Sequence, residues 1–322
     1  MTSKDKYAKF CDKVYVPIYS QTWWLDAICT PEGWDVWLYE NNNEVLAAMP
    51  YYHEKRGEYK YITKAPLTQN NGIIFSYPSG IGEIGKAAHE ERIINEMNKF
   101  IETKMVDVYE QQYHYSFKNY LPFFWNGYEA IPRYTYVIDK SLSIEEAWKK
   151  VSSKQRSVIK KGKRFGHYSE EISKEIFYEE HEKIFLKQGL ECPFSYKMWE
   201  RLYEDAKQNN QGKAACYKDG DNNIGSLIFW VWDEMSVYQL LGGGIPEYQN
   251  LDMYDALIWD GICMAKKMEK AYDFEGSMIK RISKSFREYG GELEQYFRIR
   301  KVFNKDILME ECRRQCENLE NK

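Results

Sequence analysis

Hydrophobic residues recur along the chain with two different periods, and together these periods predict an α/β protein. A spacing of three or four residues, typical of an amphipathic helix, runs through 86–104 and again through 252–268. Runs rich in aromatic and β-branched residues, bounded by turn residues, predict strands. The predicted strands are 34–40, 44–53, 59–63, 72–75, 105–113, 133–139, 213–218, 224–232, 235–241, 271–275 and 293–301.

Turn residues between neighbouring strands indicate that some of them pair directly. Asn41-Asn42-Asn43 and Asp219-Gly220-Asp221-Asn222 are typical of hairpin turns, and the polar loop Thr68–Asn71 separates two further strands. The expected pairs are 34–40 with 44–53, 59–63 with 72–75, and 213–218 with 224–232.

The middle of the chain, 143–209, is predicted to be helical. Ser143 followed by Glu146 has the pattern of a capping box at the start of a helix over 144–151. The remaining helices are expected at 152–165, 174–188 and 195–209.

The regions on either side of these helices repeat one order of elements, which is a hairpin, a further strand, an amphipathic helix and a short strand. Such a repeat indicates two copies of one α/β unit. We therefore expect an N-terminal domain at 1–140 and a C-terminal domain at 141–322, with the helical insertion near 143–209. Each domain is expected to be a twisted mixed sheet flanked by helices.

Composition and charge narrow the class of protein. The 322 residues include 45 Lys and Arg against 49 Asp and Glu, a net charge of −4, which argues against a generally basic nucleic-acid coat protein. The longest apolar run, Ile224–Trp232, is too short to cross a membrane. Seven scattered cysteines without a visible secretion signal predict a cytoplasmic protein with reduced thiols. The five histidines form no metal-binding pattern, so no metal is expected.

One candidate binding feature is the strand 235–241, which runs directly into Gly242-Gly243-Gly244. Glycines leave backbone N–H and C=O groups unobstructed, so an extended ligand with amide groups could pair with them as an extra strand. The start of the helix beyond would then face the anionic end of that ligand. The alternative is a turn that requires positive φ.

A second candidate feature is a pair of carboxylates, Asp273 and Glu275, at the end of the strand 271–275. Alternation along a strand would direct both to the same face. Two carboxylates there would raise one another's pKa and leave one as a base near neutral pH. The alternative is a helix cap or a surface pair.

Several motifs in this sequence resemble those of the Fem-type (FemAB-like) branch of the GNAT acyltransferase superfamily. They are Tyr238–Gly243, Pro246–Tyr248, Ala256–Ile262, Tyr272–Ser277, Phe286–Leu293, Tyr19–Trp24 and Ser153–Lys161. The resemblance spans 15–300 and implies two tandem GNAT-like domains. It also implies transfer of an acyl group to an amine of a cell-envelope sugar or peptide precursor. The donor would be an acyl-CoA, in the first place acetyl-CoA, or an aminoacyl-tRNA as in the cross-bridge ligases.

The resemblance suggests roles for individual residues. Glu275 would be the catalytic base, with Asp273 second and Tyr238 beside them. The expected acyl-donor residues are Leu240, Leu241, Gly242, Gly243, Gly244, Tyr248, Arg156 and Lys160. Arg156 and Lys160 match the basic motif of the branch, and helical spacing predicts that they share one face with Lys149 and Arg164.

The chain departs from the superfamily at the loop that usually binds the CoA pyrophosphate. Asp252 and Tyr254 stand where small residues are expected. A carboxylate at a helix start repels phosphate, although it is also a good N-cap.

The N-terminal region contributes a set of amide and aromatic side chains suited to hydroxyl-rich ligands. The candidate acceptor-binding residues are Gln21, Trp24, Tyr51, Gln69, Asn70, Gln112 and His114. For each, the alternative is a satisfied core or loop residue.

Two other functions stay open at this point. An aminoacyl-tRNA-dependent peptidyltransferase would need a continuous basic channel past 149–164. A non-catalytic module with a degenerate GNAT fold would explain the departure at 252–254. The expected partners are a small-molecule acyl donor and an amine acceptor, or a tRNA if the protein is the aminoacyl-tRNA-dependent enzyme. The sequence carries no signal for an oligomeric state.

Overall fold

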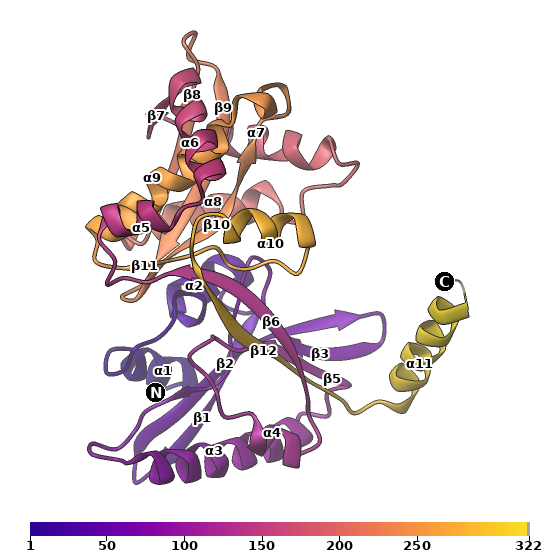
Figure 1. Ribbon diagram of the computed structural model, residues 1–322. Helices are drawn as coiled ribbons and strands as arrows, with labels where there is room; N and C mark the ends of the chain where they lie inside the picture. The colour runs from indigo at the N-terminus through magenta and orange to yellow at the C-terminus, as the bar shows by residue number, and fades with distance from the viewer. Residues whose placement is uncertain (321–322) are drawn as a thin grey trace. The chain divides into compact units, whose positions relative to one another are not determined.

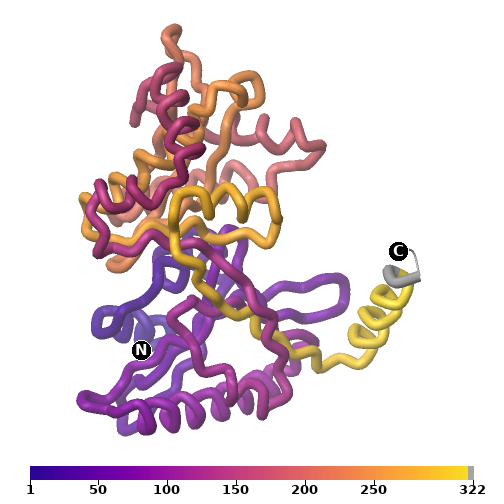
Figure 2. Tube along the Cα trace, viewed as in Figure 1, coloured from indigo at the N-terminus to yellow at the C-terminus, as the bar shows by residue number. Residues whose placement is uncertain are grey.

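The computed structural model describes residues 1–320 and forms two compact units (Figure 1). Unit 1 consists of Met1–Pro132 and the residues from Tyr296 onward, and unit 2 consists of Arg133–Gln295. The chain passes between the units within two strands, β6 (Glu129–Ile138) and β12 (Glu292–Val302), whose course can be followed in the Cα trace (Figure 2). The division therefore differs from the predicted 1–140 and 141–322, because β12 carries the chain back to pair with a strand of unit 1.

Unit 1 contains a sheet with the strand order β1-β2-β3-β5-β12. Its other strands are β1 (Trp34–Asn41), β2 (Glu44–Arg56), β3 (Tyr59–Thr63), β4 (Ile74–Phe75) and β5 (Val108–Gln112). The predicted β1–β2 hairpin is confirmed, and β3 lies parallel to β5. The predicted pairing of β3 with β4 is wrong, because β4 pairs with Ala47 and Ala48 of β2.

The helices of unit 1 are α1 (Ser3–Cys11), η1 (Ile18–Ser20), α2 (Thr22–Cys29), α3 (Glu83–Thr103), α4 (Leu121–Trp125) and α11 (Lys305–Glu320). Helices α1 and α3 both pack on β1. Ile93, Ile94, Met97 and Ile101 of the periodic apolar face of α3 are buried. The half-buried Phe100 on the same face has its ring 6.1 Å from the ring of Trp37 on β1. Trp34, on the same strand, instead contacts Tyr7 of α1 at 6.1 Å between ring centroids.

Unit 2 contains a sheet with the strand order β6-β11-β10-β9-β8-β7. The remaining strands are β7 (His167–Ser169), β8 (Gly212–Lys218), β9 (Ile224–Trp232), β10 (Ser236–Gly244) and β11 (Ala271–Asp273). Its helices are α5 (Ile144–Lys150), α6 (Ser153–Phe165), α7 (Lys174–Leu186), α8 (Tyr196–Gln208), η2 (Pro246–Leu251), α9 (Met253–Lys267) and α10 (Lys280–Arg287).

The two units repeat one order of elements, as the sequence predicts, but the third strand of unit 1 is β3 and not the predicted strand at 72–75. The series β1, β2, β3, α3, β5 in unit 1 corresponds to β8, β9, β10, α9, β11 in unit 2. In both, the third strand lies parallel to the strand that follows the helix. The α/β class with mixed sheets flanked by helices is thus confirmed.

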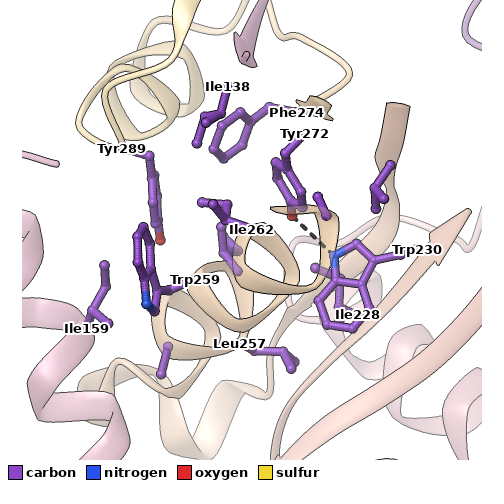
Figure 3. Close-up of a cluster of buried hydrophobic side chains, with 14 of the residues drawn as sticks. Ile138, Ile159, Ile228, Trp230, Leu257, Trp259, Ile262, Tyr272, Phe274 and Tyr289 are labelled. Carbon is purple, nitrogen blue, oxygen red and sulfur yellow. Dashed lines mark hydrogen bonds between the residues drawn. The ribbon is translucent and has the colours of Figure 1, made fainter. Parts of the chain in front are cut away.

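The core of unit 2 forms between α9 and one face of the sheet (Figure 3). Gly261 of α9 packs so closely on Trp230 of β9 that a Cβ there would lie 2.5 Å from the indole. Trp230 Nε1 donates a hydrogen bond to Tyr272 Oη (3.1 Å), and Tyr272 in turn donates to Gln239 Oε1 (2.8 Å). This buried chain of bonds ties β9, β11 and β10 together beneath α9.

The opposite face of the same sheet is covered by α7 and α8. Phe229, the neighbour of Trp230 on β9, contacts Trp199 of α8 with ring centroids 4.9 Å apart. Phe177 of α7 stacks on the same Trp199 at 4.5 Å. Successive residues of a strand point to opposite faces, so β9 separates two helical layers. No helix in the described part of the chain has the length and apolarity needed to span a membrane.

Candidate functional site

The parallel strands β10 and β11 of unit 2 separate part of the way along their length. β11 pairs with β10 only over Ser236–Tyr238, and the last pair is Tyr238 with Asp273. On its other edge β10 continues to pair with β9 as far as Gly244. Beyond Tyr238, the β11 side of β10 therefore has no partner strand within residues 1–320. An edge of this kind presents backbone N–H and C=O groups to which an extended ligand can pair.

A β-bulge lies where the two strands separate. Gln239 pairs with Trp230 and Leu241 with Phe229, so Leu240 is an extra residue on β10. A bulge bends its strand and redirects the backbone groups next to it, and bulges are frequent beside active sites. The sequence carries no local signal for this bulge, because it depends on the register with β9.

The three glycines continue β10 rather than forming a turn, so the turn alternative is wrong. Gly242 has φ of +154° and lies so close to β9 that a Cβ would be 2.6 Å from the carbonyl oxygen of Leu227. Gly242 is therefore required by the backbone at this position. At Gly244 a Cβ would make only an ordinary van der Waals contact, 3.8 Å from Cβ of Tyr254.

Glu275 lies directly beyond the end of β11 in a strained backbone conformation. Its φ is +62°, and Gly276 follows with φ of +72°. A Cβ on Gly276 would lie 2.3 Å from the carbonyl oxygen of Tyr134, so the turn is packed against β6. A left-handed conformation costs a non-glycine residue about 1–2 kcal/mol. Such strain is concentrated at functional sites.

The predicted same-face arrangement of Asp273 and Glu275 is wrong, because β11 ends at Asp273 and the left-handed turn follows. Asp273 Oδ1 accepts hydrogen bonds from Thr135 Oγ1 (2.6 Å) and from the backbone N–H of Glu275 (2.7 Å). The Asp273 carboxylate is thus used to hold the turn.

Both carboxyl groups have raised pKa values, and burial is the first cause in each. Burial raises the pKa of Asp273 to about 6, opposed by the two hydrogen bonds that it accepts. Burial alone raises the pKa of Glu275 well above its usual range. The residue is partly exposed, but its Oε1 is buried and has no hydrogen-bond partner among the described residues. The expectation that each carboxylate raises the pKa of the other is therefore wrong.

Tyr238 has a structural partner for its hydroxyl group. The hydroxyl donates to Asp233 Oδ2 at 2.9 Å, while Asp233 Oδ1 accepts from the N–H groups of Met235 and Ser236. This network holds the turn between β9 and β10. Leu240 and Leu241 lie at the bulge, whereas Tyr248 lies in η2 against Gly225 of β9.

The predicted basic face is interrupted between α5 and α6. Val151 is extended, with ψ of 133°, so Lys149 does not belong to the helix that carries Arg156, Lys160 and Arg164. Arg156 Nη1 donates to the carbonyl oxygen of Val151 at 2.6 Å and so satisfies the end of α5. Lys160 and Arg164 are exposed and form no ion pair with any described residue.

The start of α9 is covered by α6. Gly162 lies so close that a Cβ there would be 2.2 Å from the carbonyl oxygen of Asp252. Asp252 has φ of +58° and forms no side-chain cap, so the expectation of an N-cap is wrong. Its carboxylate instead pairs with Lys161 at 2.9 Å. Tyr254 accepts a hydrogen bond from Gln239 at 3.0 Å.

The candidate acceptor residues do not form a single site. The side chains of Gln21, Trp24 and Tyr51 each donate a hydrogen bond within unit 1. Trp24 Nε1, for example, donates to Thr68 Oγ1 at 3.0 Å. Gln112 Nε2 donates to the carbonyl oxygen of Gln69 at 2.6 Å. The remaining two, Asn70 and His114, line a common cavity of about 520 Å³ within unit 1.

Known proteins resemble this chain in fold but not in sequence. No protein family and no curated protein matches the sequence. A crystal structure of FemX superimposes with a TM-score of 0.68 and 11% identity, covering 96% of this chain and 98% of that one. A tandem GNAT protein from the clavulanic acid biosynthesis pathway has a TM-score of 0.50 and 8% identity, covering 89% and 97%. L-PGS from Bacillus licheniformis has a TM-score of 0.50 and 11% identity, covering 84% and 85%.

Identities this low bear on the fold alone. The similarity to FemX extends over nearly the whole of both chains and therefore includes both units. The repeated order of elements agrees with the tandem GNAT protein. The chain has a Fem-type, tandem GNAT-like fold.

Proposed function

We propose that this protein is an N-acyltransferase whose acyl donor binds along β10 in unit 2. The observation that carries the proposal is the unpaired edge of β10 beyond Tyr238, next to the strained turn that holds Glu275. An extended donor with amide groups pairs with this edge, and acetyl-CoA is the simplest such donor. GNAT and Fem are also the acyltransferase classes whose fold this chain has.

The chemistry is a direct attack of an amine on the donor carbonyl. A C–N bond forms as the C–S bond of the thioester breaks, and the leaving thiolate takes up a proton. N–H groups of β10 near the Leu240 bulge stabilise the developing oxyanion. Glu275, in its ionised form, accepts the proton that the amine loses. A raised pKa makes a carboxylate a stronger base, and this supports Glu275 over Asp273, whose oxygen is engaged by Thr135.

In this proposal the two units bind different substrates. Unit 2 holds the donor, with Arg156 and Lys160 near its phosphates, and unit 1 carries the side that recognises the acceptor. The acceptor proposed is an amine on a cell-envelope sugar or peptide precursor, in a cytoplasmic reaction.

A second candidate donor is aminoacyl-tRNA, and the covered start of α9 favours it. Gly162 and Lys161 occupy the helix start that would otherwise meet a pyrophosphate. Exposed cations without ion pairs, such as Lys160 and Arg164, suit a larger polyanion. The covered start is also the main support for a third candidate, a binding module without catalysis.

Calorimetric titration with acetyl-CoA, free CoA and ATP at low and high salt tests these donors. We expect micromolar binding of acetyl-CoA that Glu275→Gln retains, together with loss of acetyl transfer to amines in that variant. The matched control is Glu234→Gln, an exposed carboxylate in the turn between β9 and β10, which we expect to keep both properties.

Other results would select other donors. Transfer from charged tRNA without CoA binding would replace the first donor by the second. If Glu275→Gln keeps both acetyl-CoA binding and acetyl transfer, Glu275 is not the catalytic base. An absence of both CoA binding and transfer from charged tRNA would refute the transferase.

A further inference from the structure

The cavity of unit 1 lies at the position that corresponds to the donor edge of unit 2. It is lined by the segment after β3, by the first two turns of α3 and by the segment after β5. These are the counterparts of the segment after β10, the first turns of α9 and the segment after β11. The repeat therefore provides two related places for ligands, one in each unit.

The chain itself closes the strand edge in unit 1. β3 and β5 pair as far as Thr63 and Glu110. Beyond this point the backbone N–H of Asn71 donates to the carbonyl oxygen of Gln112 at 2.7 Å. Gln112 Nε2 returns a bond to the carbonyl oxygen of Gln69. An extended donor has no free edge to pair with here, and a compact cavity of about 520 Å³ is left beside it. Cavities of this size bind small molecules.

Asn70 gives this cavity a polar side chain to which a ligand could bind. Its side chain is 7% exposed and lines the cavity. Among the described residues it has no hydrogen-bond partner, whereas its neighbour Asn71 donates to the carbonyl oxygen of Tyr19 at 2.9 Å. A ligand in the cavity that carries a hydroxyl or amide group could form hydrogen bonds with this amide.

Glu90 gives the cavity a buried negative charge. The residue is 6% exposed, and its two carboxylate oxygens accept from Tyr77 Oη (2.6 Å) and Asn119 Nδ2 (2.9 Å). Both donors are neutral, and Glu90 forms no ion pair in the described part of the chain. Lys86, which also lines the cavity, has its Nζ over the Tyr77 ring at 5.0 Å from the centroid. A buried charge is stable when a cation pairs with it.

Aromatic rings form much of the remaining wall. Phe75 stacks on Phe117 with the ring planes 7° apart, and Phe75 also stacks on Tyr77. Tyr113 lies at 4.8 Å from Phe117 between ring centroids. The faces of aromatic rings close to a carboxylate form a favourable environment for an organic cation.

We propose that the unit 1 cavity is a binding site for a small organic ammonium compound that also carries a hydroxyl or amide group. Glu90 pairs with the ammonium, the aromatic wall surrounds it, and Asn70 binds the second polar group. The proposal concerns a ligand site in unit 1 and does not depend on acyl transfer in unit 2.

Isothermal titration with two matched pairs of probes tests this site. Choline is compared with 3,3-dimethyl-1-butanol, its uncharged isostere, and glucosamine with N-acetylglucosamine. We expect at least one ammonium probe to bind about tenfold or more tightly than its neutral partner. Glu90→Gln should abolish this preference, and Asn70→Ala should weaken binding of the same probe. Glu96→Gln, at a half-exposed position of α3 that does not line the cavity, is the control and should bind as the wild type does.

The titrations have results that would overturn the proposal. Failure of both ammonium probes to bind at millimolar concentration would overturn the proposal, as would binding that Glu90→Gln leaves unchanged. Near-ultraviolet circular dichroism checks that each variant is folded. If Glu90→Gln does not fold, the effect of Asn70→Ala on probe binding still tests the site. All titrations are made without an acyl donor, so they are independent of the outcome for acetyl-CoA.

Discussion

The buried carboxyl group of Glu275 should make the protein less stable as the pH rises. In the unfolded chain this group loses its proton near the ordinary glutamate value of 4.5, whereas burial raises its pKa well above that in the folded protein. Between the two values the folded state binds more protons than the unfolded state, so the free energy of unfolding falls with pH. Each pH unit in this interval costs about 1.36 kcal/mol.

Glu275→Gln removes the titration and keeps the shape and the left-handed backbone. At pH near 4.5 the variant and the wild type should therefore be equally stable. Above that pH the variant should become the more stable protein, and the difference should grow by up to about 1.36 kcal/mol per pH unit until the folded carboxyl ionises. Asp273, whose pKa of about 6 also lowers stability as the pH rises, is present in both proteins and largely cancels from the comparison.

Urea unfolding followed by fluorescence of the 10 tryptophans measures this difference at a series of pH values. The control Glu234→Gln, an exposed side chain in the same unit, should show no growth of the difference with pH. A Glu275→Gln variant whose stability relative to wild type is the same at about pH 5 and about pH 7 would refute the reasoning.

Three substitutions test the packing around the site in the same unfolding assay. Gly276→Ala should cost more than about 2 kcal/mol, because its φ is +72° and the new Cβ would lie 2.3 Å from the carbonyl oxygen of Tyr134; wild-type stability would contradict this close approach. Trp259→Ala should cost about 3–5 kcal/mol, and a loss below about 1 kcal/mol would mean that the side chain is not packed in the core. Tyr272→Phe should cost about 1–3 kcal/mol by leaving Trp230 Nε1 without its acceptor, and an unchanged stability would disprove the bond.

The long periodic elements could be predicted because local sequence determines them. The helix expected at 252–268 is α9 at Met253–Lys267, and the capping box at Ser143 is present as expected. The apolar face of each helix and the turn residues of each hairpin are local signals. The repeat of elements followed from these signals, whereas the tandem GNAT-like fold was implied by the resemblance of the motifs.

The features that shape the site could not be predicted because they depend on distant contacts. The Leu240 bulge is set by the register of β10 on β9, and the left-handed turn at Glu275 by its packing on β6. The cover over the α9 start needs Gly162, which is 90 residues away from Asp252 in the sequence. The prediction that Asp273 and Glu275 lie on one face required β11 to continue through Glu275, because side chains alternate only along a regular strand.

The two units differ in one respect that explains why only unit 2 offers a strand edge. β10 ends in three glycines that keep an extended backbone, and these glycines have no side chains that could cover the edge. After β3 the corresponding segment is Lys64-Ala65-Pro66, and proline has no N–H with which to extend a ladder. The chain of unit 1 therefore turns away and returns at Gln69–Asn71 to fill the gap beside β5. One fold thus provides an open strand edge in one copy and a partly open cavity in the other, so ligands of different chemistry can bind to the two copies.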